Sequence, residues 1–313
     1  MTDNQYLYFQ WTIWDNFADH CYSDPSVFYT VKIKGPYITK LIVSGTYNLN
    51  SLYNNDYITG LDLRRATDLE YLSFHYHPLT TVDLSKNTKL KFLYCRDNQL
   101  TSLDLSKNGE LQLLWCNDNR LRALDMSKNP QLADLCCQNN QITDLYISNN
   151  TELYELRCDN NSLSRLDLSR NPELSSLTCS DNPLTALDLS NNTGLNSLSC
   201  VNSQLTTLDV SKNTKLQSLR CHNNSLTGLD LSHNTMLRTL VCDNNQLTGL
   251  DLSFTNMAIL YCRYNALSAG ALNAMFETLP QRGGRLYIAG NPGTEACDIS
   301  IAENKGWYRE DYY

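Results

Sequence analysis

Residues 90–108 read LKFLYCRDNQLTSLDLSKN, and this pattern returns along most of the 313-residue chain. Its cysteine marks the period most clearly. Each cysteine from Cys95 to Cys242 is followed by the next after 21 residues, and Cys262 follows after 20. Phe74 stands 21 residues before Cys95 and holds the same place. Self-similarity at a fixed period predicts a chain built from stacked copies of one small unit.

The short core of the pattern, L-x-x-L-x-C-x-x-N-x-L, is a leucine-rich-repeat signature with cysteine in its third apolar place. In Leu93-Tyr94-Cys95, alternate side chains face opposite ways, so Leu93 and Cys95 face the core and Tyr94 faces outward. The sequence therefore predicts a repeat solenoid, a right-handed coil of parallel β-sheets. It should contain ten or eleven 21-residue repeats and little helix outside a C-terminal cap.

Ten units fit the pattern, and an eleventh, degenerate unit is predicted at Leu41-Ile42-Val43, before an insertion around residues 48–55. Two asparagine columns accompany the units. Asn98 and its copies end each strand, where a buried amide can satisfy backbone groups of the turn, and Ser203 breaks this column. The column that includes Asn108 is followed by Thr, Pro or Gly, which is turn chemistry.

The ends of the chain depart from the repeat. We expect an N-terminal cap over residues 1–57, repeats over 58–266 and a C-terminal cap over 267–313. The expected elements in the two caps are a strand at Val27–Ile33, a helix at Ala269–Leu279, a strand at Arg285–Ala289 and a last helix at Thr294–Asn304. Such caps cover the open ends of a solenoid.

Charge and hydropathy exclude several classes of partner. The net charge is 25 minus 33, or −8, which is unfavourable for binding nucleic acid or an anionic membrane surface. No stretch approaches the roughly 20 apolar residues of a membrane helix, and no signal peptide is visible. We expect contact with a membrane only through an anchor that this sequence does not contain.

The repeat and the C-terminal segment resemble the internalin-like leucine-rich-repeat proteins of Bacteroidetes bacteria. The resemblance spans about residues 58–308, and the segments at 271–280 and 287–293, Cys297-Asp298 and Lys305-Gly306-Trp307 look like the end cap of that group. It implies a surface or secreted protein that binds a protein or a glycan, so we expect an extracellular or cell-surface location. It transfers no catalytic residue.

The cysteine column has two alternatives to simple packing, metal ligation and disulfides. Each cysteine replaces a core leucine, and a free thiol behaves as a small hydrophobe, so we expect packing. Cys136, next to Cys137, should then point outward. Metal at the His75–His77 pair is also weighed, but no carboxylate or cysteine partner stands nearby in sequence. We therefore expect no cofactor and no metal.

A column of aspartates, which includes Asp104, raises the further alternative of a calcium site. Bases such as Lys107 follow most of the acids by three residues. A charge-matched, solvated face therefore explains this column better than bound cations do.

Function is predicted from the outward places of the strands. In the middle repeats these places hold mostly serine and threonine, whereas in the first repeats they hold aromatic and charged residues. Exposed aromatic groups ringed by charge are typical of binding hot spots. The predicted ligand-binding residues are Tyr71, Phe92, Tyr94, Arg96, Leu113, Trp115, Asp134 and Arg157, with His75 beside them.

Two alternatives for this surface stay open, namely cross-strand stacking alone and coverage by the N-terminal cap. For the whole chain, the main hypothesis is a non-catalytic binding module for an unidentified protein or glycan. A structural spacer or surface-layer component without a specific ligand is the alternative. An enzyme is third, because no nucleophile–base pair, phosphate loop or metal cluster stands out.

Overall fold

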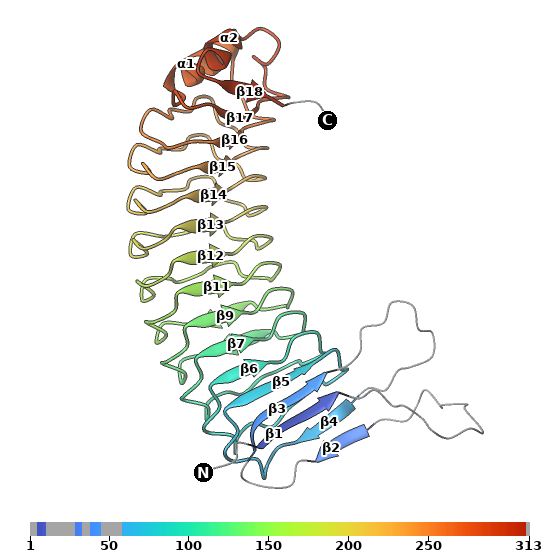
Figure 1. Ribbon diagram of the computed structural model, residues 1–313. Coiled ribbons are helices and arrows are strands. Elements are labelled where there is room, and N and C mark those ends of the chain that lie inside the picture. The colour runs from blue at the N-terminus through green and yellow to red at the C-terminus, as the bar shows by residue number, and fades with distance from the viewer. Residues whose placement is uncertain (1–4, 11–28, 33–37, 45–57, 311–313) are drawn as a thin grey trace, which may run out of the picture. The chain divides into compact units, whose positions relative to one another are not determined.

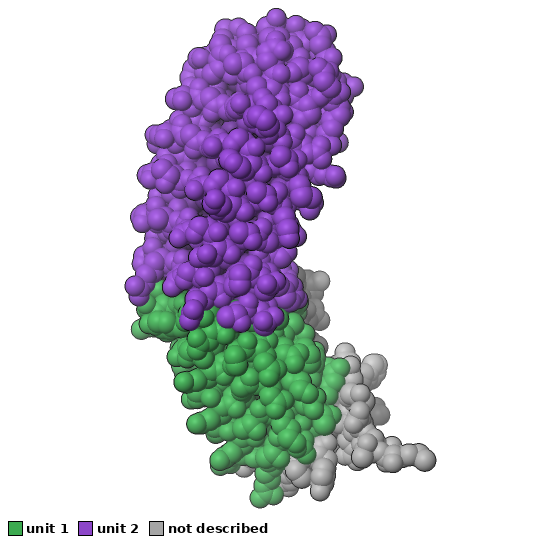
Figure 2. Space-filling view, turned by 90° about the vertical axis from the view of Figure 1, so that its left-hand side faces the viewer, with its two compact units in different colours: residues 1–150 green, residues 151–313 purple. Residues whose placement is uncertain are grey.

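The computed structural model describes residues 5–10, 29–32, 38–44 and 58–310 (Figure 1). The fold is a parallel β-solenoid of about 11 turns with a spacing of about 21 residues and little helix, which confirms the predicted fold class. By compactness the chain divides into a first unit, residues 1–150, and a second unit, residues 151–313 (Figure 2).

The first unit contains a ladder of parallel strands that successive turns contribute. In order across the sheet these strands are β1 (Gln5–Gln10), β3 (Ile38–Ser44), β5 (Tyr71–His75), β6 (Phe92–Tyr94), β7 (Leu113–Trp115) and β9 (Asp134–Cys136). Leu72, Leu93 and Leu114 align across neighbouring strands, so strands one turn apart pair in register, as predicted.

Two sheets of two strands each form on the second side of the first unit. β2 (Tyr29–Lys32) pairs with β4 (Ile58–Asp62), and β8 (Ala123–Asp125) pairs with β10 (Asp144–Tyr146). β2 lies inside the strand predicted at Val27–Ile33. β3 contains the degenerate repeat and pairs with β5. The insertion around residues 48–55 lies outside the described residues.

The second unit continues the same pattern and ends in two helices. Its strands are β11 (Glu155–Arg157), β12 (Ser176–Thr178), β13 (Ser197–Ser199), β14 (Ser218–Arg220), β15 (Thr239–Val241), β16 (Ile259–Tyr261), β17 (Gly284–Tyr287) and β18 (Trp307–Arg309). α1 (Ala269–Thr278) agrees with its prediction and packs Leu272, Met275 and Phe276 inward.

The last predicted helix, Thr294–Asn304, is wrong in length, because only Ser300–Glu303 forms α2. The Thr294 hydroxyl donates to the carbonyl of Ile288 and accepts from the amide of Asn291. These bonds hold the segment that begins at Thr294 in turns instead of a continuous helix.

Each turn buries a fixed set of apolar side chains. In the turn that begins at Leu90, the fully buried members are Leu90, Leu93, Cys95 and Leu100, and Leu105 is 1% exposed. All nine cysteines of the column from Cys95 to Cys262 are buried thiols. Burial raises the pKa of six of these thiols, and to about 12 for Cys200, so their uncharged form persists; the six are Cys95, Cys116, Cys179, Cys200, Cys221 and Cys242.

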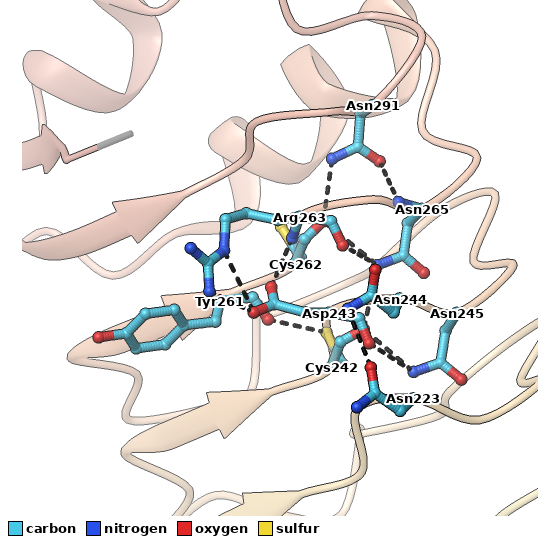
Figure 3. Close-up of polar contacts among 10 residues, drawn as sticks. All are labelled: Asn223, Cys242, Asp243, Asn244, Asn245, Tyr261, Cys262, Arg263, Asn265 and Asn291. Carbon is cyan, nitrogen blue, oxygen red and sulfur yellow. Dashed lines mark hydrogen bonds and ion pairs between the residues drawn. The ribbon is translucent and has the colours of Figure 1, made fainter. Parts of the chain in front are cut away.

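Buried asparagines join each turn to its neighbours. The Asn119 amide donates to the carbonyls of Cys95 and Cys116 at 2.9 and 3.1 Å, and its Oδ1 accepts from the amide of Leu100 at 2.9 Å. Figure 3 shows the same arrangement for Asn245 and Asn265 beside Cys242 and Cys262. The predicted role of this column, which we call the strand-end clamp, is confirmed.

The cap extends the strand-end clamp. Asn291, in the C-terminal cap, donates to the carbonyl of Cys262 at 2.9 Å and accepts from the amide of Asn265 at 3.1 Å. It therefore stands where the next repeat would supply its own asparagine. The end of the solenoid is closed by the same interaction that joins the turns.

The second asparagine column is also a buried clamp. Asn108 is fully buried, and its amide donates to the carbonyls of Leu84 and Asn87 at 3.2 and 2.8 Å. Asn129 and Asn213 repeat this pattern. The sequence predicts only a turn at these asparagines, but each of them also donates hydrogen bonds to the backbone of the preceding turn.

Ser203 shows what one missing amide changes. Where other turns hold Asn, Ser203 donates only to the carbonyl of Val201, at 3.5 Å. In the preceding turn, the backbone amide of Leu163 donates to the side-chain oxygen of Asn182. The equivalent amide, that of Leu184, has no such side chain to bond and donates to the Asn182 backbone carbonyl at 2.8 Å. One link between neighbouring turns is lost at this position.

Burial of the cysteine column predicts strong protection from thiol reagents. In the folded protein at pH 8, the nine column cysteines should not react with Ellman's reagent, because all nine are buried away from it. In denaturant without reductant all nine should react. Recovery of three or fewer additional thiols would contradict this expectation. The half-buried Cys297 and Cys21, outside the described residues, are not part of the prediction.

Candidate functional site

The outward places of the first unit lie side by side because its strands pair in register. One row aligns Lys40, Tyr71, Phe92, Leu113 and Asp134 across β3, β5, β6, β7 and β9. A second row, two residues further along each strand, contains Ser73, Tyr94, Trp115 and Cys136. The aromatic residues predicted from the sequence therefore form one continuous surface.

Three rings on neighbouring strands form a chain of contacts that crosses the two register rows. We call Tyr71, Tyr94 and Trp115 the aromatic row; Tyr94 contacts both of the others. The ring centroids of Tyr71 and Tyr94 lie 5.3 Å apart, and Tyr94 meets Trp115 edge to face at 5.3 Å. Phe92 lies 6.3 Å from Tyr71. Each ring is half-buried rather than fully exposed, because its neighbours cover part of it.

Charged groups stand at both ends of the aromatic row. The Lys40 ammonium lies 4.5 Å from the centroid of the Tyr71 ring, a cation–π distance. At the other end, the Trp115 indole donates to Asp134 at 3.4 Å. Lys40 is not among the residues predicted from the sequence, because it lies in the degenerate repeat, where no cysteine marks the outward place. Counting back from Leu41 would have found it.

Asp134 and Cys136 differ from their expected exposure. The sequence predicts Asp134 among the exposed charges, yet it is 7% exposed, and Cys136, which is predicted to point outward, is 2% exposed. Both occupy outward places in register with Leu113 and Trp115. The Cys136 thiol lies 3.9 Å from the Asp134 carboxylate, which also accepts from the indole. Contacts with neighbouring side chains therefore bury these two residues on the outward face.

The two predicted arginines do not join the aromatic row. Arg96 lies 5.3 Å from the Tyr76 ring and forms an ion pair with Asp97 at 3.3 Å. Arg157 belongs to the second unit, where its Nε donates to Glu155 at 2.7 Å. The structure therefore gathers six of the eight predicted residues, Tyr71, Phe92, Tyr94, Leu113, Trp115 and Asp134, in adjoining outward places.

The histidines near this face have structural partners. His75 lies 3.4 Å from the Ser73 hydroxyl, and His77, which is 4% exposed, accepts from the amide of Ile58 at 3.4 Å. Burial is the main cause that lowers the pKa of His77 to about 4. Within the described residues, no group of three or more His, Cys, Asp or Glu could hold a metal ion.

The aspartate column is held by its own turns. Asp104 Oδ1 accepts from the backbone amide of Ser106 at 2.9 Å, and Asp83, Asp188 and Asp209 repeat the bond. Hydrogen bonds from Ser106 are the largest cause that lowers the pKa of Asp104, and the charge of Lys107 is a smaller one. The acids therefore stabilise turns first and pair with bases only weakly.

This ranking gives a testable order of stabilities. Asp104→Ala should lower the free energy of unfolding more than Lys107→Ala, which should cost under about 1 kcal/mol. Asp104→Asn should retain most of the stability, because its amide oxygen can still accept from Ser106. Since the folded pKa of Asp104 is lowered, its contribution is present above the unfolded value of about 3.9 and is lost as pH falls through the folded value.

Urea denaturation at pH 7 and pH 2.5 measures both effects for Asp104→Ala. The difference from wild type should shrink at the lower pH. A larger cost for Lys107→Ala than for Asp104→Ala would show instead that the ion pair dominates.

No protein-family model matches the chain, and no curated protein matches its sequence. Among solved structures it is similar to the functional domain of InlJ from Listeria monocytogenes, described as including a cysteine ladder, with a TM-score of 0.66 and 27% identity. The match covers 88% of this chain and 63% of that one, so the chain spans less than two thirds of that structure's length.

Two further structures share the fold. The internalin InlF of Listeria monocytogenes matches with a TM-score of 0.70 and 24% identity over 88% of this chain and 82% of that one. The leucine-rich-repeat ectodomain of an Arabidopsis thaliana membrane receptor kinase, solved in complex with CASPARIAN STRIP INTEGRITY FACTOR 2, matches with a TM-score of 0.61 and 25% identity over 73% and 30%. The chain thus has an internalin-like leucine-rich-repeat fold.

Proposed function

We propose that this chain is a non-catalytic binding module that acts outside the cell or at its surface and recognises a protein or a glycan. The proposed contact surface is the strand face of the first unit. The aromatic row, Tyr71, Tyr94 and Trp115, carries the proposal, with Lys40 at one end and Asp134 at the other. Half-exposed aromatics flanked by charge combine contact area with polar anchoring.

Comparison with the second unit argues against stacking as the only role of these rings. β12, β13 and β14 pair in the same register with serine in the places that correspond to Tyr71 and Phe92. The sheet therefore forms without aromatic residues there. Contacts between rings on neighbouring strands stabilise a sheet by only about 0.2–1 kcal/mol per pair. The strands that carry serine form the same sheet without this stabilisation.

The fold supports the proposal. The similar plant ectodomain was solved with a bound factor, so a leucine-rich-repeat solenoid can serve recognition. No helix in the described part of the chain is long and apolar enough to cross a membrane. A surface-layer spacer is the alternative, and it would need no aromatic row on one part of its strand face.

A double variant tests the contact surface. Wild-type protein is screened on a glycan array and in a pull-down from host extracellular proteins, and any ligand found is titrated against Tyr94→Ala, Trp115→Ala. Removal of two of the three rings of the aromatic row should weaken binding by about tenfold or more. The matched control is Ser176→Ala, Ser197→Ala, which truncates outward places of the second unit and should leave the affinity unchanged.

The folded state of both double variants is checked by circular dichroism and urea denaturation. Unchanged affinity of a folded Tyr94→Ala, Trp115→Ala protein would show that another surface binds. A wild-type protein that retains no glycan and no protein would favour the spacer.

A further inference from the structure

The second unit carries its own aromatic feature at the C-terminal end of its strand face. Tyr261 on β16 and Tyr287 on β17 are aligned in register, and their rings stack with centroids 3.9 Å apart and an angle of 4° between their planes. The Tyr287 hydroxyl donates to Glu310. These contacts fix the position of both rings.

An ion pair between the buried Asp243 and the half-buried Arg263 lies beside this stack. Asp243, 5% exposed, accepts from Arg263 Nε at 3.2 Å and from its terminal nitrogen at 2.8 Å. The guanidinium carbon lies 5.4 Å from the Tyr261 centroid and 5.8 Å from that of Tyr287, so it sits beside the pair. Figure 3 shows Tyr261 and Arg263 projecting to the same side, away from the asparagine column.

Within residues 58–310, Tyr287 is the one ring that stacks on Tyr261. Because its first face stacks on Tyr287, its second face is directed toward β15. The register neighbour there is Val241, and the next residue across, on β14, is Arg220. Val241 is only partly buried, and its side chain is shorter than a tyrosine ring. We call Val241, with Tyr261 on one side and Arg220 on the other, the Val241 step.

The space between Tyr261 and Arg220, above Val241, is wide enough for one flat ring. Arg220 and Tyr261 are two strand spacings apart, or about 9.6 Å between backbones. A ring lying on Tyr261 above Val241 would take the next place in the stack and would meet Arg220 on its other side. Arg220 is exposed and forms no ion pair within residues 58–310. Its donors are therefore available to an incoming group.

Polar groups surround the same position on the strand. Thr239 precedes Val241 by two residues and faces the same way, and Asp243 follows by two with Arg263 bound to it. An aromatic hydrocarbon ring placed here would offer no hydrogen-bond acceptor at its edge to the Thr239 hydroxyl or the Arg220 guanidinium. A pyranose ring has an apolar C–H face for Tyr261 and hydroxyl groups around its edge for these neighbours.

We propose that the Val241 step is a glycan subsite that binds one pyranose ring against the free face of Tyr261. It lies in the second unit, so it is a site additional to the aromatic row and does not depend on it. Arg220, Thr239 and the Asp243–Arg263 pair supply the hydrogen bonds to the sugar edge. The stack with Tyr287 holds the Tyr261 ring in place before the sugar arrives, which lowers the entropic cost of binding.

Saturation-transfer difference NMR on the full chain tests the subsite with defined probes. These are maltohexaose, cellohexaose, chitohexaose, xylohexaose and a galacturonate hexamer, with p-cresol as the mimic of an aromatic side chain from a protein partner. At least one oligosaccharide should receive saturation, and p-cresol should receive less. Saturation of p-cresol alone, or of no probe, would overturn the proposal.

A substitution that fills the step separates binding from folding. Val241→Tyr places a third ring on the Tyr287–Tyr261 stack, so the variant should fold at least as well as wild type and bind the active oligosaccharide about tenfold or more weakly. Ser197→Tyr is the matched control, because it adds the same ring on β13, away from the step, and should leave binding unchanged. Tyr261→Ala should also abolish binding.

The same titration distinguishes this subsite from the face of the first unit. Binding that survives Val241→Tyr but is lost in Tyr94→Ala, Trp115→Ala would overturn the glycan subsite and support the proposed function of the first unit. Binding lost only in Val241→Tyr supports the subsite.

Discussion

The turns within residues 58–310 enclose backbone N–H and C=O groups that no strand ladder can satisfy, and asparagine side chains satisfy many of them. An amide can donate and accept at once, so Asn119 bridges carbonyls of two turns while it receives the amide of Leu100. The column of Asn108 and its copies does the same on another side of the coil with its donors. The same apolar residues can repeat in the core of each turn because these two columns provide hydrogen-bond partners for the buried backbone groups.

The outward side chains can vary because the buried residues of each turn repeat so regularly. Register, spacing and turn geometry are set by the leucines, cysteines and asparagines, so the outward side chains can change from turn to turn without altering the coil. In the first unit they form the aromatic row between Lys40 and Asp134. In the second unit they change from serines on β12 and β13 to the stacked pair Tyr261 and Tyr287. Recognition is proposed at the places where the surface departs from the repeat.

The sequence predicted what periodicity controls and missed what depends on neighbouring side chains. A 21-residue period was enough to assign the coil, its register and the outward orientation of Tyr94 and Trp115. It could not predict that Asp134 and Cys136 are buried, because that burial comes from neighbouring side chains such as Trp115 on the same face. The aspartates were matched with lysines by spacing, whereas their main partner is the serine amide two residues on. Asn108 followed by Gly109 looks like an ordinary turn in sequence, and its bonds to the preceding turn appear only in three dimensions.

Ser203 allows the most direct test of the claim that asparagine clamps hold the turns together. Ser203→Asn should place an amide oxygen where the Leu184 amide can donate to it, as Asn182 does for Leu163. The account predicts slower hydrogen exchange at Leu184 and a free energy of unfolding that rises by about 1 kcal/mol, the net contribution of a typical hydrogen bond. Gln204→Asn, at the exposed neighbouring position, is the control and should change neither value. Unchanged exchange at Leu184 together with unchanged or lower stability of Ser203→Asn would contradict the account.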